Sequence, residues 1–167
     1  MNLSGIEPSA PQVGDWAPDF DLPAVIAGVK KRFRLAECRG QRNVVLAFYP
    51  LNWEPVSAKQ LAQYQDAREK FAARNASVVA LSVDSIMNST AWEREIGPFD
   101  FALASDFWPH GEVTRRYGVL RESGPNTGSG ERAIFVVDHR GKIVFRRVYE
   151  SGVVPEVEET LVTLRSL

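Results

Sequence analysis

The chain has 167 residues, a length typical of one domain and sufficient for a substantial hydrophobic core. Apolar residues make up 44% of it and include nine Phe and four Trp, which indicates a globular protein rather than a disordered one. The formal net charge of -1 gives no reason to expect nucleic acid or an anionic membrane as a partner. No apolar run approaches the length of a membrane-spanning helix.

The first part of the chain leads into one strongly apolar strand. Residues 1–11 are polar, contain two prolines and are predicted to form a loose arm. Residues 33–35 alternate apolar and polar side chains, as a short strand does, and the basic residues at 30–32 are interpreted as the solvated face of a hairpin or loop. Residues 44–49 are continuously apolar, which predicts a strand buried on both faces.

Helical and strand patterns alternate after this strand. Residues 58–74 have a helical pattern, with Leu61, Tyr64 and Phe71 near one face, and residues 77–83 predict a second buried strand. The sequence Thr-Ala-Trp-Glu at 90–93 matches a capping box, so we expect a short helix to open there and to stop at Gly97.

The remaining pattern predicts short strands and helices that end in a hairpin and a helix. The predicted elements are a strand at 101–103, a helix at 112–117, a hairpin of strands 133–138 and 143–149, and a helix after Pro155. This order predicts a three-layer α/β fold of the thioredoxin type, with a central mixed sheet of at least five strands flanked by helices on both faces. No repeat or linker is visible, so residues 1–167 are expected to form a single domain.

The loop after the strand at 44–49 carries the most specific pattern. Residues 50–57, Pro-Leu-Asn-Trp-Glu-Pro-Val-Ser, resemble the active-site loop of peroxiredoxins, whose pattern is Pro, three residues, Thr or Ser, two residues, then the peroxide-reacting Cys. Pro50 matches the proline, Glu54 stands at the Thr position, and Ser57 stands at the Cys position. The resemblance implies a peroxiredoxin-type thioredoxin-like fold whose peroxidatic thiol is replaced by a hydroxyl.

Three further segments extend the resemblance over most of the chain. Residues 43–50 are similar to the strand that delivers the active-site loop, and residues 105–111 and 117–119 are similar to the one-cysteine alkyl hydroperoxide reductase E group. Arg132, just before the strand at 133–138, matches the arginine that faces the cysteine. The resemblance implies that Arg132 lies beside Ser57 and Glu54, lines a shallow pocket with them, and pairs with Glu54.

The family resemblance also implies an activity and partners. Peroxiredoxins (the AhpC/TSA family) are antioxidant oxidoreductases that reduce hydrogen peroxide and organic hydroperoxides with thiols and need no cofactor. A one-cysteine enzyme takes its reducing equivalents from an external thiol. A homodimer is expected, because Trp53, Phe107 and Trp108 are large apolar residues in turn-like segments of the kind that suit an interface, although the same side chains could instead cover the core of the domain.

The chemistry of peroxide reduction explains why the residue at position 57 matters. The thiolate is the nucleophile, and a sulfenic acid forms when it cleaves the O–O bond. A serine hydroxyl has a pKa far above neutral and needs an adjacent general base, and no hydrolase motif surrounds Ser57. We therefore expect no peroxide reduction by Ser57, which could also simply cap the helix. Glu54 could accept a hydrogen bond from peroxide, or it could be an acidic residue favoured by the helix dipole.

The other reactive side chains give no second site. Cys38 is the single cysteine, which excludes an intramolecular disulfide and favours a reducing cytoplasm, and it lies outside the peroxidatic and usual resolving positions. His110 and His139 have no neighbouring ligands at metal-binding spacing. Two hypotheses follow: an inactive Cys→Ser variant of a peroxiredoxin, or a natural pseudo-peroxiredoxin that acts as a binding, sensor or chaperone-like protein.

Overall fold

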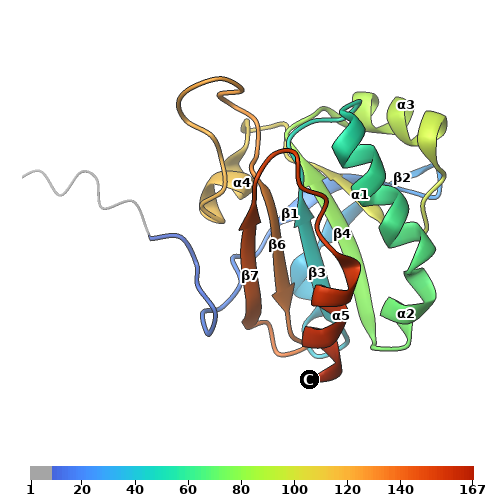
Figure 1. The fold of residues 1–167 in the computed structure, drawn as a ribbon, viewed down its shortest axis with the longest axis vertical. Coiled ribbons are helices and arrows are strands. Elements are labelled where there is room, and N and C mark those ends of the chain that lie inside the picture. The colour runs from blue at the N-terminus through green and yellow to red at the C-terminus, as the bar shows by residue number, and fades with distance from the viewer. Residues whose placement is uncertain (1–8) are drawn as a thin grey trace, which may run out of the picture.

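The computed structural model describes residues 9–167, so most of the predicted N-terminal arm lies outside the described residues. A seven-stranded mixed sheet in the order β2-β1-β5-β4-β3-β6-β7 forms its centre (Figure 1). The strands are β1 (Asp21–Ile26), β2 (Val29–Arg34), β3 (Asn43–Phe48), β4 (Ala76–Ser82), β5 (Ala102–Ser105), β6 (Arg132–Val137) and β7 (Ile143–Tyr149). The three strands β3, β4 and β5 are parallel to one another, and the other pairings are antiparallel.

Helices cover both faces of this sheet. The helices that contribute to the core on one face are α1 (Pro55–Asp66), α2 (Arg68–Ala72), α3 (Ile86–Ile96) and α5 (Val157–Arg165) (Figure 1). The opposite face is covered by α4 (Glu112–Arg116), by the short 3-10 helix η1 (Leu35–Cys38), and by aromatic side chains from the adjoining loops. The predicted three-layer thioredoxin-like architecture is confirmed.

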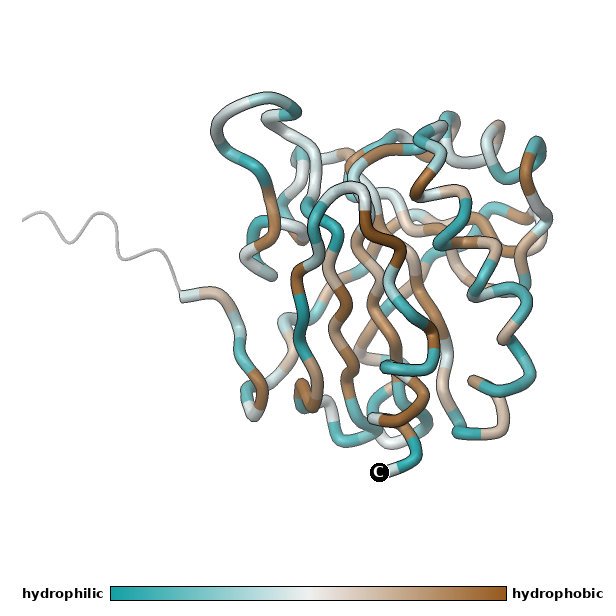
Figure 2. Tube along the Cα trace, viewed as in Figure 1, coloured by the Kyte–Doolittle hydropathy of each residue, from teal (hydrophilic) through white to brown (hydrophobic). Residues whose placement is uncertain are grey.

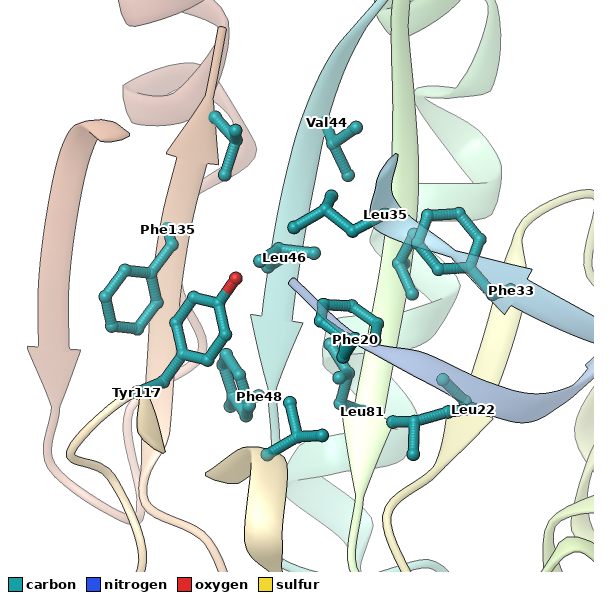
Figure 3. Close-up of a cluster of buried hydrophobic side chains, with 14 of the residues drawn as sticks. Phe20, Leu22, Phe33, Leu35, Val44, Leu46, Phe48, Leu81, Tyr117 and Phe135 are labelled. Carbon is teal, nitrogen blue, oxygen red and sulfur yellow. The ribbon is translucent and has the colours of Figure 1, made fainter. Parts of the chain in front are cut away.

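The buried strand β3 contributes side chains to the hydrophobic cores on both faces of the sheet. All six of its residues are buried, and its side chains alternate between faces, with Leu46 and Phe48 in one cluster and Val45 and Ala47 in the other. Figure 2 shows the apolar residues concentrated along the central strands. Figure 3 shows the first cluster, in which aromatic rings pack around Leu46.

The structure corrects several boundaries predicted from the sequence. The strand expected at 33–35 spans Val29–Arg34, and Leu35 is the first residue of η1. The predicted helix at 58–74 is divided at Ala67 into α1 and α2. The helix predicted to open at Thr90 begins at Ile86, because Ser85 already caps it by accepting a hydrogen bond from the Asn88 N–H at 3.2 Å. Thr90 lies inside α3, where its hydroxyl donates to the Ile86 carbonyl. The predicted end of this helix, at Gly97, is confirmed.

Candidate active site

The segment between β3 and α1 places Ser57 in the first turn of a helix. Pro50 is buried in the bend that follows β3, and Pro55 occupies the first helical position, where its fixed φ suits a helix start. Between them Trp53 has a left-handed φ of 68°, and its indole N–H donates to the Asn88 side-chain oxygen at 2.9 Å. The loop is therefore tied to α3 while it delivers Ser57 to the C-terminal end of β3.

Glu54, not Ser57, caps this helix. Its carboxylate accepts hydrogen bonds from the backbone N–H groups of Val56 at 2.8 Å and Ser57 at 2.7 Å. The Ser57 hydroxyl also donates to Glu54 Oε2, at 2.6 Å. The capping role considered for Ser57 is wrong, because Ser57 lies inside the first turn and its hydroxyl is a donor to the residue that does cap.

Arg132 enters the site from the neighbouring strand. It is the first residue of β6, which pairs with β3 so that Ala133 lies opposite Phe48. Its Nη1 donates to Ser57 Oγ at 3.1 Å, and its Nη2 donates to Glu54 Oε2 at 3.0 Å. The predicted proximity of Arg132, Ser57 and Glu54, and the predicted ion pair, are confirmed. Pro50, whose side chain has no polar atoms, takes no part in these hydrogen bonds.

The site is closed rather than open. Ser57 and Arg132 have no exposed surface, so neither lines the shallow pocket expected from the sequence. The side chain of Glu54 is about one-third exposed, and its carboxylate accepts hydrogen bonds from the N–H groups of the helix start and from the guanidinium. The Glu54 carboxylate, held by its ion pair with Arg132, fills the shallow pocket that was expected from the sequence.

The electrostatics favour the ionised form of Glu54. Burial alone would raise the pKa of this carboxyl group. The hydrogen bonds from the Ser57 hydroxyl, from the N–H groups of Val56 and Ser57, and from Arg132 outweigh burial and hold the pKa of Glu54 below its ordinary value. At neutral pH the site therefore contains a carboxylate and a guanidinium with matched charges.

Two contacts that the sequence did not suggest hold Arg132 in place. Gln60 is fully buried, accepts from Arg132 Nη1 at 2.6 Å, and donates to the Tyr64 hydroxyl at 2.9 Å. The Ser151 carbonyl accepts from Arg132 Nη2 at 3.1 Å. Gln60 lies three residues after Ser57, hence on the same helix face, and this spacing could have indicated it. No local pattern indicates Ser151.

Cys38 lies far from this cluster. It precedes β3, whereas Ser57 follows β3, so about six residues of strand, roughly 20 Å, separate them. Its side chain is buried in the core, and burial raises the pKa of the thiol. Among residues 9–167 there is no group of three or more His, Cys, Asp and Glu side chains that could hold a metal ion. Within the same range no helix is both long and apolar enough to cross a membrane.

Comparison with known proteins gives one consistent answer. The model of the AhpC/TSA family matches residues 13–146. Alkyl hydroperoxide reductase E of Mycobacterium tuberculosis is 36% identical over 140 residues, which is 84% of this chain and 87% of that protein. The chloroplastic 2-Cys peroxiredoxin BAS1 of Hordeum vulgare is 32% identical over 163 residues, which is 94% of this chain and 75% of that protein.

The solved structures agree with the sequence relatives. The reduced 2-Cys peroxiredoxin of Plasmodium vivax superimposes with a TM-score of 0.84 at 26% identity, over 92% of this chain and 80% of that one. The mitochondrial 2-Cys peroxiredoxin of Plasmodium falciparum has a TM-score of 0.83 at 26% identity, over 93% of each chain. Because the family model covers most of the chain and several relatives exceed 30% identity, this protein belongs to the AhpC/TSA family of peroxiredoxins.

Proposed function

We propose that this chain is a peroxiredoxin in which Ser57 stands at the position of the peroxide-reacting cysteine, so that it reduces no peroxide as written. The observation that carries the proposal is the 3.1 Å contact between Arg132 Nη1 and Ser57 Oγ in the first turn of α1. A guanidinium and a helix start are the two features that stabilise a thiolate at such a place. A hydroxyl there forms no sulfenate and completes no redox cycle.

A thiol at position 57 would make this scaffold a thiol-dependent peroxidase for hydrogen peroxide and organic hydroperoxides. Cys38 is the only cysteine and is buried, so an external thiol would have to reduce the oxidised enzyme. The absence of a disulfide partner also supports our proposal of a cytoplasmic location. We propose that residues 1–167 act as one domain, supported by the single continuous sheet.

A second candidate function, a natural pseudo-peroxiredoxin that works by binding or sensing, is favoured by one contact. The Ser57 hydroxyl donates to the Glu54 carboxylate at 2.6 Å. A thiolate at position 57 has no proton to donate, and it would face the same carboxylate as a like charge. The Ser57 hydroxyl therefore suits the Glu54 carboxylate better than a thiolate would, which favours a chain in which the two residues occur together naturally.

Steady-state peroxide consumption tests the first proposal. The chain as written, a Ser57→Cys variant and a Ser57→Cys, Cys38→Ala variant are each assayed with hydrogen peroxide, an organic hydroperoxide and excess dithiothreitol. We expect no consumption by the chain as written and consumption by both variants. Consumption by the chain as written that disappears in a Cys38→Ala variant would show instead that Cys38 carries the activity.

We also propose that the protein is a homodimer. Trp108 is 80% exposed, Trp53 54% and Phe107 51%, and large exposed aromatic side chains suit a protein–protein interface. Trp53 directly precedes Glu54, so an interface that covers it would border the candidate site.

A further inference from the structure

We propose that the donors around Ser57 form a binding site for a small monocarboxylate, and that Glu54 occupies this site from within the same chain. On this proposal Glu54 is an internal ligand that excludes external anions and oxygen-rich molecules. The inference uses the site of the proposed function, but it concerns anion binding and requires no peroxide chemistry.

The first observation is the number of donors that converge on one carboxylate. Glu54 Oε1 accepts from the Val56 N–H at 2.8 Å. Oε2 accepts from the Ser57 N–H at 2.7 Å, from the Ser57 hydroxyl at 2.6 Å and from Arg132 Nη2 at 3.0 Å. Four donors directed at two oxygens define a site shaped for a planar carboxylate, with both oxygens bound.

The second observation is the burial of Arg132. Its side chain has no exposed surface, and Glu54 is the only carboxylate within ion-pair distance of it among residues 9–167. Its other acceptors, Ser57 Oγ, the Gln60 side-chain oxygen and the Ser151 carbonyl, are neutral. A buried cation that loses its only counter-ion is strongly destabilised, so a chain in which the Glu54 side chain is truncated should take an anion from solution.

The third observation explains why the native chain would not bind such an anion. Glu54 is joined to the helix it caps, so its effective concentration at the donors is far above that of a free ligand. The same hydrogen bonds keep the carboxyl group ionised at neutral pH, so protonation does not release it. Opening the site therefore requires loss of the Glu54 side chain.

Chemical rescue of a Glu54→Ala variant tests the proposal. Its urea-unfolding midpoint is measured with added sodium acetate, sodium formate, sodium chloride or acetamide at matched concentrations. We expect acetate and formate to raise the midpoint saturably and the neutral isostere acetamide to leave it unchanged. At acetate about ten times above the Kd, linkage multiplies the folding equilibrium constant about elevenfold. The chain as written, with its site filled, should respond to acetate no more than to chloride.

Two further variants control for size and for failure to fold. Glu54→Gln fills the site with an uncharged side chain, so acetate should not stabilise it. Glu54→Thr leaves the carboxylate space free with a smaller disturbance of the turn, and it should respond as Glu54→Ala does. If either opened variant is unfolded in dilute buffer, recovery of its circular dichroism spectrum in acetate, but not in acetamide, supports the proposal.

Three results would overturn this inference. They are equal stabilisation of the opened variants by chloride and acetate, no stabilisation by either anion, and failure of both opened variants to fold even in saturating acetate. None of these results depends on whether Ser57→Cys reduces peroxide. A protein could therefore fail one test and pass the other.

Discussion

At the scale of single residues, Glu54 and Ser57 depend on each other. The hydroxyl gives its proton to a carboxylate that also holds the charge of Arg132, so one residue caps the helix and balances a buried cation. In a peroxidase the same guanidinium would face a thiolate, and a second anion beside it would oppose ionisation of the thiol. We therefore expect the identity of residue 54 to affect how easily a thiol at position 57 would ionise.

Gln60 is the residue whose loss should most directly loosen Arg132. Replacing Gln60 by Ala leaves the buried Nη1 without the acceptor at 2.6 Å, which should lower the free energy of unfolding by about 1–3 kcal/mol. Gln63→Ala, an exposed glutamine on the same helix, is the matched control and should change stability by no more than about 0.5 kcal/mol. Equal effects in urea titrations would show that Gln60 does not hold the guanidinium.

Glu93 should make stability depend on pH. It is buried in α3, and burial raises the pKa of its carboxyl group above the ordinary value despite hydrogen bonds from the N–H groups of Gly28 and Phe99. Because the folded state holds the proton more tightly, the contribution of Glu93 is full below its unfolded pKa and is lost as the pH rises through the folded pKa.

The measurement is the unfolding free energy of Glu93→Gln relative to the chain as written, from about pH 4 to about pH 8. The Gln variant should gain relative stability as the pH rises. Glu95→Gln, at an exposed position of the same helix, should show no such trend. A relative stability of Glu93→Gln that stays constant over this range would mean that the carboxyl group has an ordinary pKa in the folded protein.

At the scale of secondary structure, helix α3 allows the observed capping residue, Ser85, to be compared with the one suggested by the sequence, Thr90. Ser85→Ala removes the observed cap and should cost about 0.5–2 kcal/mol of stability. Thr90→Ala should cost less, because Thr90 lies within the helix and Ala has the higher helix propensity. A lower unfolding midpoint for Thr90→Ala than for Ser85→Ala would indicate instead that the helix begins at Thr90, as the capping-box sequence suggested.

The elements that the sequence predicted well are those with one dominant pattern. The apolar run of β3 and the alternating hairpin of β6 and β7 lie close to their expected positions. Strand β1 was not predicted, because a proline such as Pro23 argues against a strand in the sequence, although the strand runs through it. Only Ala24 and Val25 pair with β5, so the missing N–H of Pro23 costs the sheet little. Whether a strand tolerates a proline therefore depends on its pairing with strands that are distant in sequence, which the local sequence does not show.

The candidate site could be predicted in part for a similar reason. Pro50, Glu54, Ser57 and Arg132 were indicated by the resemblance to a family, and three of them meet in one hydrogen-bonded cluster. The closed state was not predicted, because it depends on the conformation of the Glu54 side chain. The Ser151 carbonyl was not predicted either, since a backbone acceptor leaves no signal in the identity of its residue.

At the scale of the whole molecule, the exposed aromatic residues should control assembly. A Phe107→Glu, Trp108→Glu variant places charge where we propose that a partner subunit packs, so it should sediment as a monomer at micromolar concentration. The chain as written should sediment as a dimer under the same conditions. Val162→Glu changes an exposed apolar residue of α5 and should leave the dimer intact. A monomeric chain as written would contradict the proposed homodimer.

The most direct test of the central claim is a single-turnover measurement of sulfenic acid at position 57. Ser57→Cys, Cys38→Ala protein is mixed with excess hydrogen peroxide, and sulfenic acid is trapped and located by mass spectrometry. We expect one oxidation event per subunit at position 57, formed faster when Glu54→Thr is added, because the competing carboxylate is then gone. If no sulfenic acid forms in either variant, this scaffold does not retain peroxiredoxin active-site geometry, and the binding-protein function would be the better account.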